Sequence, residues 1–263
     1  MNLREKQMLN ILKKLKQESG ALAVKAEFEA EGTRIDELLR LIEIARKADL
    51  NVALKIGGCE AIRDLIESKQ LGVEYIIAPM VETPYALSKF IDAKNKIYEP
   101  VEQEDTAFLF NVETITAFNH IEEMAKLASA KNGLDGLVFG RVDFCGSMGW
   151  DRLDINTDKV TDYCVKAGQY CLEAGIDMVV GGAVSIDALL MLKRIKESNL
   201  TRFETRKVIF NANAIDSPSI EAGLLDAVKF EMLWLMNKRD YYSMIMKEDD
   251  ARIAMLEARW KVL

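Results

Sequence analysis

The chain has 263 residues, of which 49% are hydrophobic and 29% are charged, and its formal net charge is −7. A chain of this length and composition can bury a large core and is not expected to be disordered. The negative charge argues against nucleic acid as a partner, and no stretch of about 18 uncharged apolar residues predicts a membrane span.

The first residues and the cysteines indicate the cellular compartment and argue against one kind of metal site. The opening MNLREKQ contains no apolar signal core, so we expect a cytoplasmic protein. The four cysteines form no C-x-x-C pair and are accompanied by one histidine, which argues against a zinc site. We therefore expect free thiols in a reducing compartment.

The predicted elements begin with a helix over residues 1–19 and continue as an alternation of two patterns. Short runs rich in Val, Ile and Phe are near-continuously apolar, as strands buried on both faces are. Amphipathic stretches with helical period separate them, which predicts βαβ units, a parallel sheet and an α/β fold of the TIM-type (β/α)8 barrel class. The runs span residues 21–29, 51–58, 74–82, 107–114, 136–144, 177–184 and 207–213.

These runs number seven, one fewer than a complete barrel needs. The helix over residues 1–19 stands where a full barrel would place its first strand. Either residues 20–24 hold part of a degenerate first strand, or the barrel is incomplete there. No linker interrupts the chain, so we predict a single domain over residues 1–263.

The chain from about residue 219 to residue 263 reads as helical and is rich in methionine and aromatic residues. That is more apolar surface than a helix needs to dock on its own barrel. We predict that these C-terminal helices take part in a homo-oligomer, with ordinary core packing as the alternative.

Catalytic groups in a parallel barrel lie at the carboxyl ends of the strands and in the loops that follow. Glu113 and Asp143 end two neighbouring predicted strands, and paired carboxylates suit a hard divalent ion such as Mg²⁺ or Mn²⁺. Helix capping is the alternative role of these two residues. Other strand-end candidates are Lys25, Glu27, Glu29, Lys55, Gly57, Gly58, Gly140, Arg141, Asn211 and Asn213.

Three segments carry a resemblance to a known family. FNVETITAFNHIEEMAKL and DGLVFGRVDFCGSMG resemble the paired signature of the HpcH/HpaI aldolase and citrate lyase family. YIIAPMVETPYALSKFI resembles the strand and helix that precede that signature. The likeness is specific over residues 75–149 and loose from about Ala21 to the helix after Ile215, and it implies a phosphoenolpyruvate/pyruvate-type barrel.

The resemblance also implies a site. Glu113 and Asp143 would bind Mg²⁺, Mn²⁺ or a similar ion. The backbone N–H groups of Gly140, Arg141, Val142 and Asp143 would hold the carboxylate of a pyruvate-like ligand. The implied activity is that of a metal-dependent carbon–carbon lyase or aldolase, which acts on a 2-keto acid and an aldehyde through a metal-stabilised enolate.

Other functions remain open on the same scaffold. A citrate-lyase-like enzyme would cleave a thioester, and a related enzyme would use phosphoenolpyruvate. A non-catalytic barrel that keeps its metal site is the third alternative. In addition, the glycines at 57 and 58 precede a predicted helix, where backbone N–H groups can bind an anion or where glycine is needed only for steric reasons.

The sequence departs from the family pattern at two positions. Lys55 stands where the pyruvate aldolases of the family carry an arginine, and lysine lacks the planar fork of arginine. The region aligned with the family's catalytic histidine has none, so the acid–base group would be Glu27, Glu29 or Lys25. The lysines also permit a Schiff-base mechanism as an alternative, and we interpret His120 as a structural or surface residue.

Overall fold

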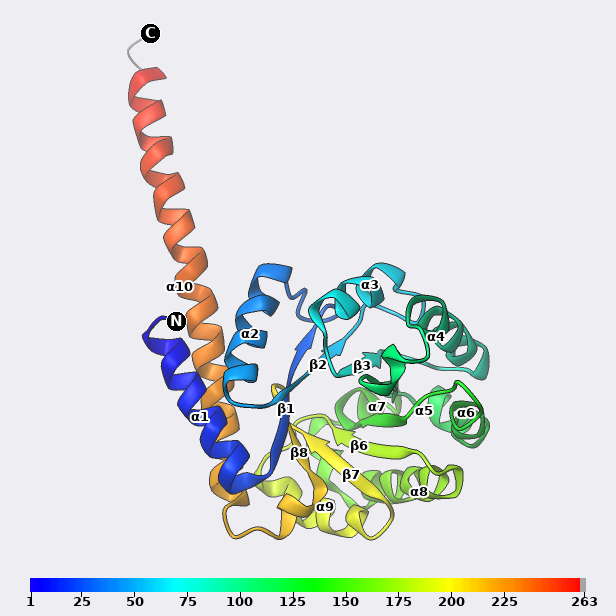
Figure 1. The fold of residues 1–263 in the computed structure, drawn as a ribbon. Coiled ribbons are helices and arrows are strands. Elements are labelled where there is room, and N and C mark those ends of the chain that lie inside the picture. The colour runs from blue at the N-terminus through cyan, green and yellow to red at the C-terminus, as the bar shows by residue number, and fades with distance from the viewer. Residues whose placement is uncertain (261–263) are drawn as a thin grey trace.

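The computed structural model describes residues 1–260, whose strands close into an eight-stranded barrel surrounded by helices (Figure 1). The strands follow one another around the barrel in chain order. The predicted TIM-type α/β barrel is confirmed, and its first strand is intact. The strands are β1 (Ala21–Glu27), β2 (Asn51–Lys55), β3 (Tyr75–Ala78), β4 (Ala107–Val112), β5 (Gly136–Gly140), β6 (Asp177–Gly181), β7 (Leu200–Glu204) and β8 (Val208–Asn211).

The strand absent from the sequence prediction is β7, not the first strand. Only the three residues 205–207 join β7 to β8, and a parallel pair would need a crossover of a dozen residues or more. β8 therefore runs antiparallel to both β7 and β1, whereas the other adjacent pairs are parallel. The prediction of a fully parallel sheet is wrong for this last strand.

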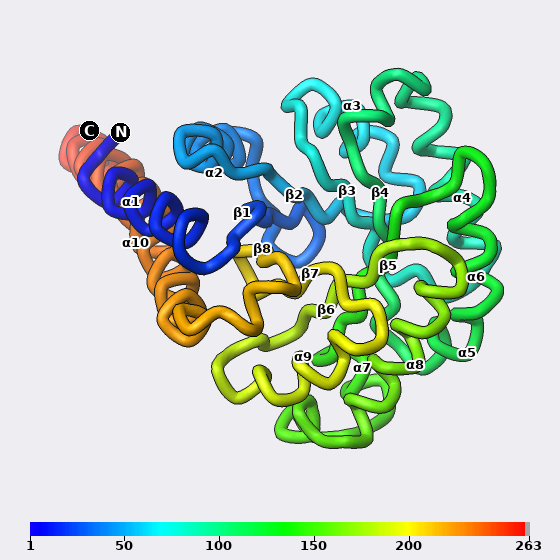
Figure 2. The backbone as a smooth tube through the Cα atoms, turned by 60° about the horizontal axis from the view of Figure 1, so that its bottom comes forward, coloured from blue at the N-terminus to red at the C-terminus, as the bar shows by residue number. Residues whose placement is uncertain are grey.

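The helices cover the outside of the barrel, as the view in Figure 2 also shows. Their starts follow local rules: Thr83 accepts a hydrogen bond from the Ala86 N–H, and Pro84 is the first residue of its helix. The α-helices are α1 (Leu3–Ser19), α2 (Ile35–Lys47), α3 (Ile62–Leu71), α4 (Pro84–Ile97), α5 (Ile115–Asn119), α6 (Ile121–Ala128), α7 (Arg141–Ser147), α8 (Asp158–Ala174), α9 (Leu189–Lys196) and α10 (Ile220–Trp260). None of these helices is both long and apolar enough to cross a membrane.

α1 and α10 lie side by side and run antiparallel (Figures 1 and 2). Asn2 donates to Asn237 at 2.7 Å near one end of the pair, and Lys14 contacts Asp226 at 2.8 Å nearer the other. The predicted C-terminal helices are thus one long helix. The last three residues of that predicted region, 261–263, lie outside the described residues.

The barrel interior is filled by one apolar layer. Alternate residues of a strand point to opposite faces, so each inward residue is followed by another two positions later. The apolar inward layer consists of Ala23, Ala53, Ile77, Leu109, Val138, Val179 and Ile209, and each is buried. A larger cluster fills the space between the strands and the surrounding helices. The next inward layer, toward the carboxyl ends of the parallel strands, is where polar side chains begin.

Candidate active site

The layer above the apolar ring consists of charged and small residues. Two positions after the ring residues of β1, β2 and β4 come Lys25, Lys55 and Asn111, all buried. The corresponding residues of β5 and β6 are Gly140 and Gly181, which are paired across the two strands. The barrel mouth is therefore lined by lysines and an amide on one side and by two glycines on the other.

Glu113 is the centre of one group in this mouth. It follows β4 directly and is 4% exposed. Lys55 Nζ lies 3.1 Å from Glu113 Oε1, and Asn111 Nδ2 donates to the same oxygen. Glu29 Oε2 also lies 3.1 Å from Lys55 Nζ, at ion-pair distance but without hydrogen-bond geometry. The structure thus brings together three predicted site residues, Lys55, Glu29 and Glu113.

Burial raises the pKa of Glu113, although Lys55 and Asn111 oppose that shift. Burial alone would lower the pKa of Lys55, but the charges of Glu113 and Glu29 outweigh it and raise this pKa above its ordinary value. Lys55 is therefore a cation in a carboxylate-rich site. A neutral amine, which a Schiff base requires, is disfavoured here.

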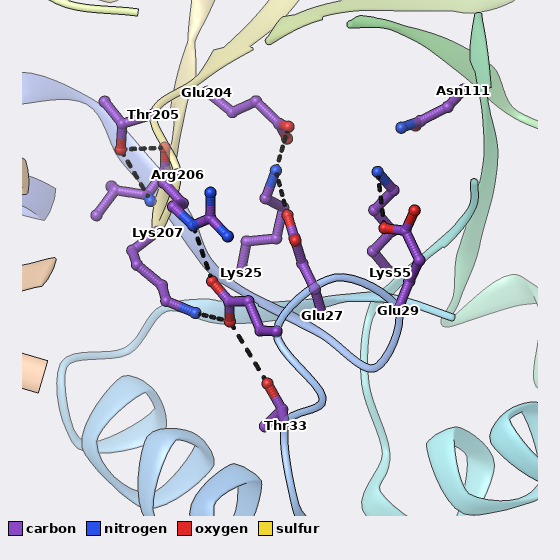
Figure 3. A network of polar contacts seen from close by, with 12 residues as sticks. Lys25, Glu27, Glu29, Thr33, Lys55, Asn111, Glu204, Thr205, Arg206 and Lys207 are labelled. Carbon is purple, nitrogen blue, oxygen red and sulfur yellow. Dashed lines mark hydrogen bonds and ion pairs between the residues drawn. The ribbon is translucent and has the colours of Figure 1, made fainter. Parts of the chain in front are cut away.

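Lys25 is the centre of a second group, which Figure 3 shows beside Lys55, Glu29 and Asn111. Lys25 Nζ contacts Glu204 and lies 3.4 Å from Glu27. Burial alone would lower the pKa of Lys25, but Glu204 and Glu27 raise it, so Lys25 too is held as a cation. The same lysine and Lys55 lower the pKa of Glu27 against the opposing effect of its burial.

Glu204 is a residue of the mouth that the sequence analysis missed. It ends β7, a strand without a clear apolar run, so no signal marked it as a strand end. The hairpin also places Arg206 and Lys207 at the mouth, where both contact Glu31 (Figure 3). Conversely, Asn211 lies at the opposite end of the barrel because β8 is reversed. Its side chain accepts from the Asn213 N–H, so the placement of these two asparagines at the mouth is wrong.

The two paired glycines make room for the two glutamates. A Cβ added at Gly140 would lie 2.6 Å from Glu113 Cγ, and one added at Gly181 would lie 2.9 Å from Glu204 Oε1. Each carboxylate therefore sits over a glycine in a space that a side chain would fill. The close approach of the two glutamates explains why β5 and β6 end in glycine.

Arg141 follows β5 and is fully buried, but its side chain does not face the mouth. Its guanidinium donates to the carbonyl oxygens of Gly181, Gly182 and Ile155 and to Asn156 Oδ1, over distances of 2.6–3.3 Å. The side chain therefore ties the end of β6 to the start of α7. Arg141 would therefore contact a ligand through its backbone N–H, as the resemblance implies, and not through its side chain.

The remaining predicted positions are distributed around the site. The Gly57 N–H donates to Asp64 Oδ2 at 2.7 Å, so it already has an anionic acceptor within the chain, and Gly58 is half-buried beside it. α3 begins only at Ile62, which leaves the two glycines in a loop rather than at a helix start. His120 is exposed at the junction of α5 and α6.

The donors near Glu113 fit a hard divalent ion. Glu113 Oε2 and Asn111 Oδ1 are buried and have no hydrogen-bond partner among residues 1–260. Asp143 is exposed in the first turn of α7, and its charge contributes to the raised pKa of Glu113, so it lies nearby. No group of three or more metal-ligating side chains occurs within the described chain. Two carboxylates completed by water or substrate oxygens are a usual environment for Mg²⁺.

Gly140→Ala should displace the Glu113 carboxylate while leaving the barrel folded, because the added methyl group meets a flexible side chain. Changes to the groups that orient a metal ligand typically cost roughly 10- to 100-fold in metal affinity, so we expect a loss of that order for a divalent ion. Calorimetric titration with Mn²⁺ measures it. Gly58→Ala is the matched control, since no atom lies within 4 Å of its added Cβ. Equal affinities in the two variants would contradict this account of Gly140.

Comparison with known proteins places the chain in a family. The profile of the HpcH/HpaI aldolase/citrate lyase family matches residues 18–191, which include β1 to β6 and both predicted metal ligands. The chain belongs to this family. Its members are aldolases and citrate lyases, which indicates an enzyme of the lyase class. A search of curated proteins found no match.

Solved structures support the fold. An HpcH/HpaI aldolase from Desulfitobacterium hafniense DCB-2 aligns with a TM-score of 0.59 and 13% identity, over 78% of this chain and 83% of its own. An HpcH/HpaI aldolase/citrate lyase family protein from Burkholderia cenocepacia J2315 aligns with a TM-score of 0.61 and 14% identity, over 91% and 90% of the two chains. A variant of the citrate synthase SbnG aligns with a TM-score of 0.52 and 16% identity, over 76% and 89%. At these identities the likeness concerns the fold.

Proposed function

We propose that the chain is a divalent-metal-dependent carbon–carbon lyase or aldolase that acts on a 2-keto acid. The observation that carries the proposal is the Glu113 carboxylate. One of its oxygens is held by Lys55 and Asn111, while the other is buried without a hydrogen-bond partner among the described residues. A buried carboxylate with one unsatisfied oxygen is costly unless a ligand completes it.

Glu113 and Asp143 would hold the ion, and Mg²⁺ or Mn²⁺ suits their oxygen donors. The bound ion would supply Lewis-acid polarisation of the substrate. Lys55 has the role of a fixed positive charge beside the reacting keto oxygen. Cleavage of the bond between the carbon next to the keto group and the carbon beyond it leaves an enolate, so negative charge develops on the keto oxygen. A buried ammonium ion beside that oxygen stabilises the charge.

Proton transfer falls to Glu29, in the loop after β1, which contacts Lys55 and is only partly buried. Glu27, at the end of β1, is less suited to this role. Its lowered pKa makes it ionised but a weak proton acceptor near neutral pH. Lys25, held as a cation by Glu204 and Glu27, adds positive charge for the substrate carboxylate. The aldehyde partner would enter beside these residues.

Calorimetric titration of the metal-stripped protein with oxalate, with and without Mg²⁺ or Mn²⁺, tests the proposal. Oxalate has the planar shape and charge of a 2-keto acid that has lost a proton. We expect binding only in the presence of the ion, and loss of that binding in Glu113→Gln, which keeps the side-chain size but removes the charge.

Glu82→Gln is the matched control, since Glu82 is an exposed strand-end glutamate that hydrogen-bonds Thr114 outside the Lys55 group. Binding of oxalate that is indifferent to the ion, or that survives in Glu113→Gln, would exclude this site as the metal centre. Absence of binding under every condition would favour a thioester or phosphoenolpyruvate substrate.

A further inference from the structure

Glu204 is a second buried carboxylate of the mouth with one unpaired oxygen. It ends β7 and is 4% exposed. Lys25 donates a hydrogen bond to its Oε1, and the carboxylate points toward that lysine in Figure 3. The other oxygen, Oε2, is buried and has no hydrogen-bond donor in the described part of the chain. Burial of an unpaired carboxylate oxygen is costly, so we expect a group from outside the chain to pair with it.

The surroundings of Glu204 match those of Glu113. Each carboxylate accepts from a buried lysine at one oxygen and has the other oxygen buried without a donor among residues 1–260. Glu204 lies over Gly181 as Glu113 lies over Gly140. The two glycines are paired on adjacent strands, which lie about 4.8 Å apart. The two unpaired oxygens therefore belong to neighbouring spaces of one mouth.

Neutralisation of Lys25 does not by itself account for Glu204. Glu27 Oε1 lies 3.4 Å from Lys25 Nζ and already supplies one negative charge. A second buried carboxylate around the same ammonium ion repels the first and must be desolvated as well. The presence of Glu204 is explained better if its free oxygen also binds a ligand.

The free oxygen of Glu204 limits the kind of group that can bind. An ionised carboxylate only accepts hydrogen bonds, so the ligand has to present a donor. Charges on this side of the mouth are balanced, with three cations and three carboxylates in ion pairs: Lys25, Arg206, Lys207, Glu27, Glu31 and Glu204. An ammonium group from the ligand would upset this balance, whereas a hydroxyl group is a neutral donor.

We propose that Glu204 forms a second subsite of the mouth, which binds a hydroxyl group of the reactant that joins the 2-keto acid. The inference rests on the proposed function, which places the 2-keto acid at Glu113. The hydroxyl group donates to Oε2, while Lys25 holds Oε1. The last bond of a glutamate side chain rotates over a broad range, so a small rotation turns Oε2 toward the ligand. The second reactant is thus a short carbonyl compound that carries a hydroxyl group.

Three short ketones test the subsite without any reaction. Hydroxyacetone carries a hydroxyl donor, methoxyacetone keeps the oxygen but has no hydrogen to donate, and aminoacetone carries an ammonium group. Ligand-observed NMR titration of the full chain, with Mg²⁺ and oxalate present and then with both omitted, measures their affinities. Oxalate has no carbon that can attack a ketone. We expect hydroxyacetone to bind about 10- to 100-fold more tightly than methoxyacetone, the range of one hydrogen bond to a charged group.

Glu204→Gln should abolish this preference. Lys25 requires an oxygen acceptor, so the amide oxygen of the variant faces Lys25 and its NH₂ group, a donor, takes the place of Oε2. Methoxyacetone should then bind as well as hydroxyacetone. Glu82→Gln, which changes an exposed glutamate at another strand end, is the matched control and should keep the preference.

Gly181→Ala is a second variant, which keeps the charge of Glu204. Its added Cβ would lie 2.9 Å from Glu204 Oε1 and 3.1 Å from Cγ, so the flexible carboxylate has to move. We expect the preference for hydroxyacetone to fall in this variant too. The affinity of Glu204→Gln for oxalate with Mg²⁺ should equal that of the wild type, because the subsite lies beside the ion and not at it.

Equal affinities of hydroxyacetone and methoxyacetone in the wild type, or no binding of hydroxyacetone, would overturn the inference. A preference that survives in Glu204→Gln would do the same. Tighter binding of aminoacetone than of hydroxyacetone would overturn the assignment of a hydroxyl group, and loss of oxalate binding in Glu204→Gln would place Glu204 at the ion instead. Failure of the proposed function is a separate result, in which oxalate binds without need of the ion while the ketones still discriminate through Glu204.

Discussion

Lys55→Ala should slow the metal-dependent exchange of the pyruvate methyl protons for deuterium by about 100- to 1000-fold, the range lost when one electrostatic donor is removed from a reacting oxygen. Lys55 Nζ lies 3.1 Å from both Glu113 and Glu29, and no other lysine or arginine among residues 1–260 forms an ion pair with either carboxylate. Proton NMR in deuterium oxide measures the exchange. It requires no knowledge of the aldehyde partner.

The same variant separates two roles of Lys55. If this lysine stabilises charge on the substrate, the affinity for the divalent ion should not fall. Removing a positive charge beside Glu113 should instead strengthen the attraction of its carboxylate for Mn²⁺. Lys55→Arg keeps the charge and should retain part of the rate, and the exposed Lys131→Ala is a control for the loss of a lysine. An unchanged exchange rate in Lys55→Ala would remove Lys55 from the mechanism.

Arg141→Met should lower the stability of the folded protein by about 3 kcal/mol, because its four hydrogen bonds to the β6 end and to residues 155–156 are lost together. Methionine has a similar unbranched stem, so the change leaves little empty volume. For a chain of this size, the loss corresponds to a fall in Tm of about 6–12 °C.

Thermal unfolding followed by circular dichroism measures that shift. Arg152→Met is the matched control, since Arg152 is exposed, lies eleven residues after Arg141 in the sequence, and should change Tm by less than about 2 °C. An Arg141→Met protein that unfolds at the wild-type temperature would show that these hydrogen bonds do not hold the mouth together. The prediction concerns the side chain alone and leaves the backbone N–H untouched.

Much of the barrel was predictable because seven strands carry near-continuous apolar runs. Such runs result from burial on both faces, and their ends located Lys25, Lys55 and Glu113 at one mouth. β7 could not be recognised in the sequence because it lacks such an apolar run. Its inward residues are the charged Arg202 and Glu204, which form ion pairs with Asp177 and Lys25 respectively. Only Leu200 and Phe203 are left as apolar residues, too few for a strand signal.

The hairpin that follows was equally hidden. Short hairpins are usually marked by glycine or asparagine, and the turn of Thr205, Arg206 and Lys207 contains neither. From the sequence alone the last strand is therefore expected to be parallel, which places Asn211 at the wrong end of the barrel. Pairings such as Lys25 with Glu204 were beyond reach for the same reason, since they depend on a strand that had not been recognised.

The short hairpin between β7 and β8 also sets the direction of the C-terminal helix α10. In a barrel of this class each helix runs in the direction opposite to the strand before it. A last strand parallel to the others would therefore have sent α10 toward the base of the barrel. Here β8 runs toward the base of the barrel, and α10 starts beside Ser19 at that base and runs back past Asn2. Its far end emerges on the side of the barrel that carries the candidate active site. The length of one loop thus sets the end of the barrel at which α10 emerges. A crossover in place of the hairpin would make β8 parallel to its neighbours and would send α10 toward the base.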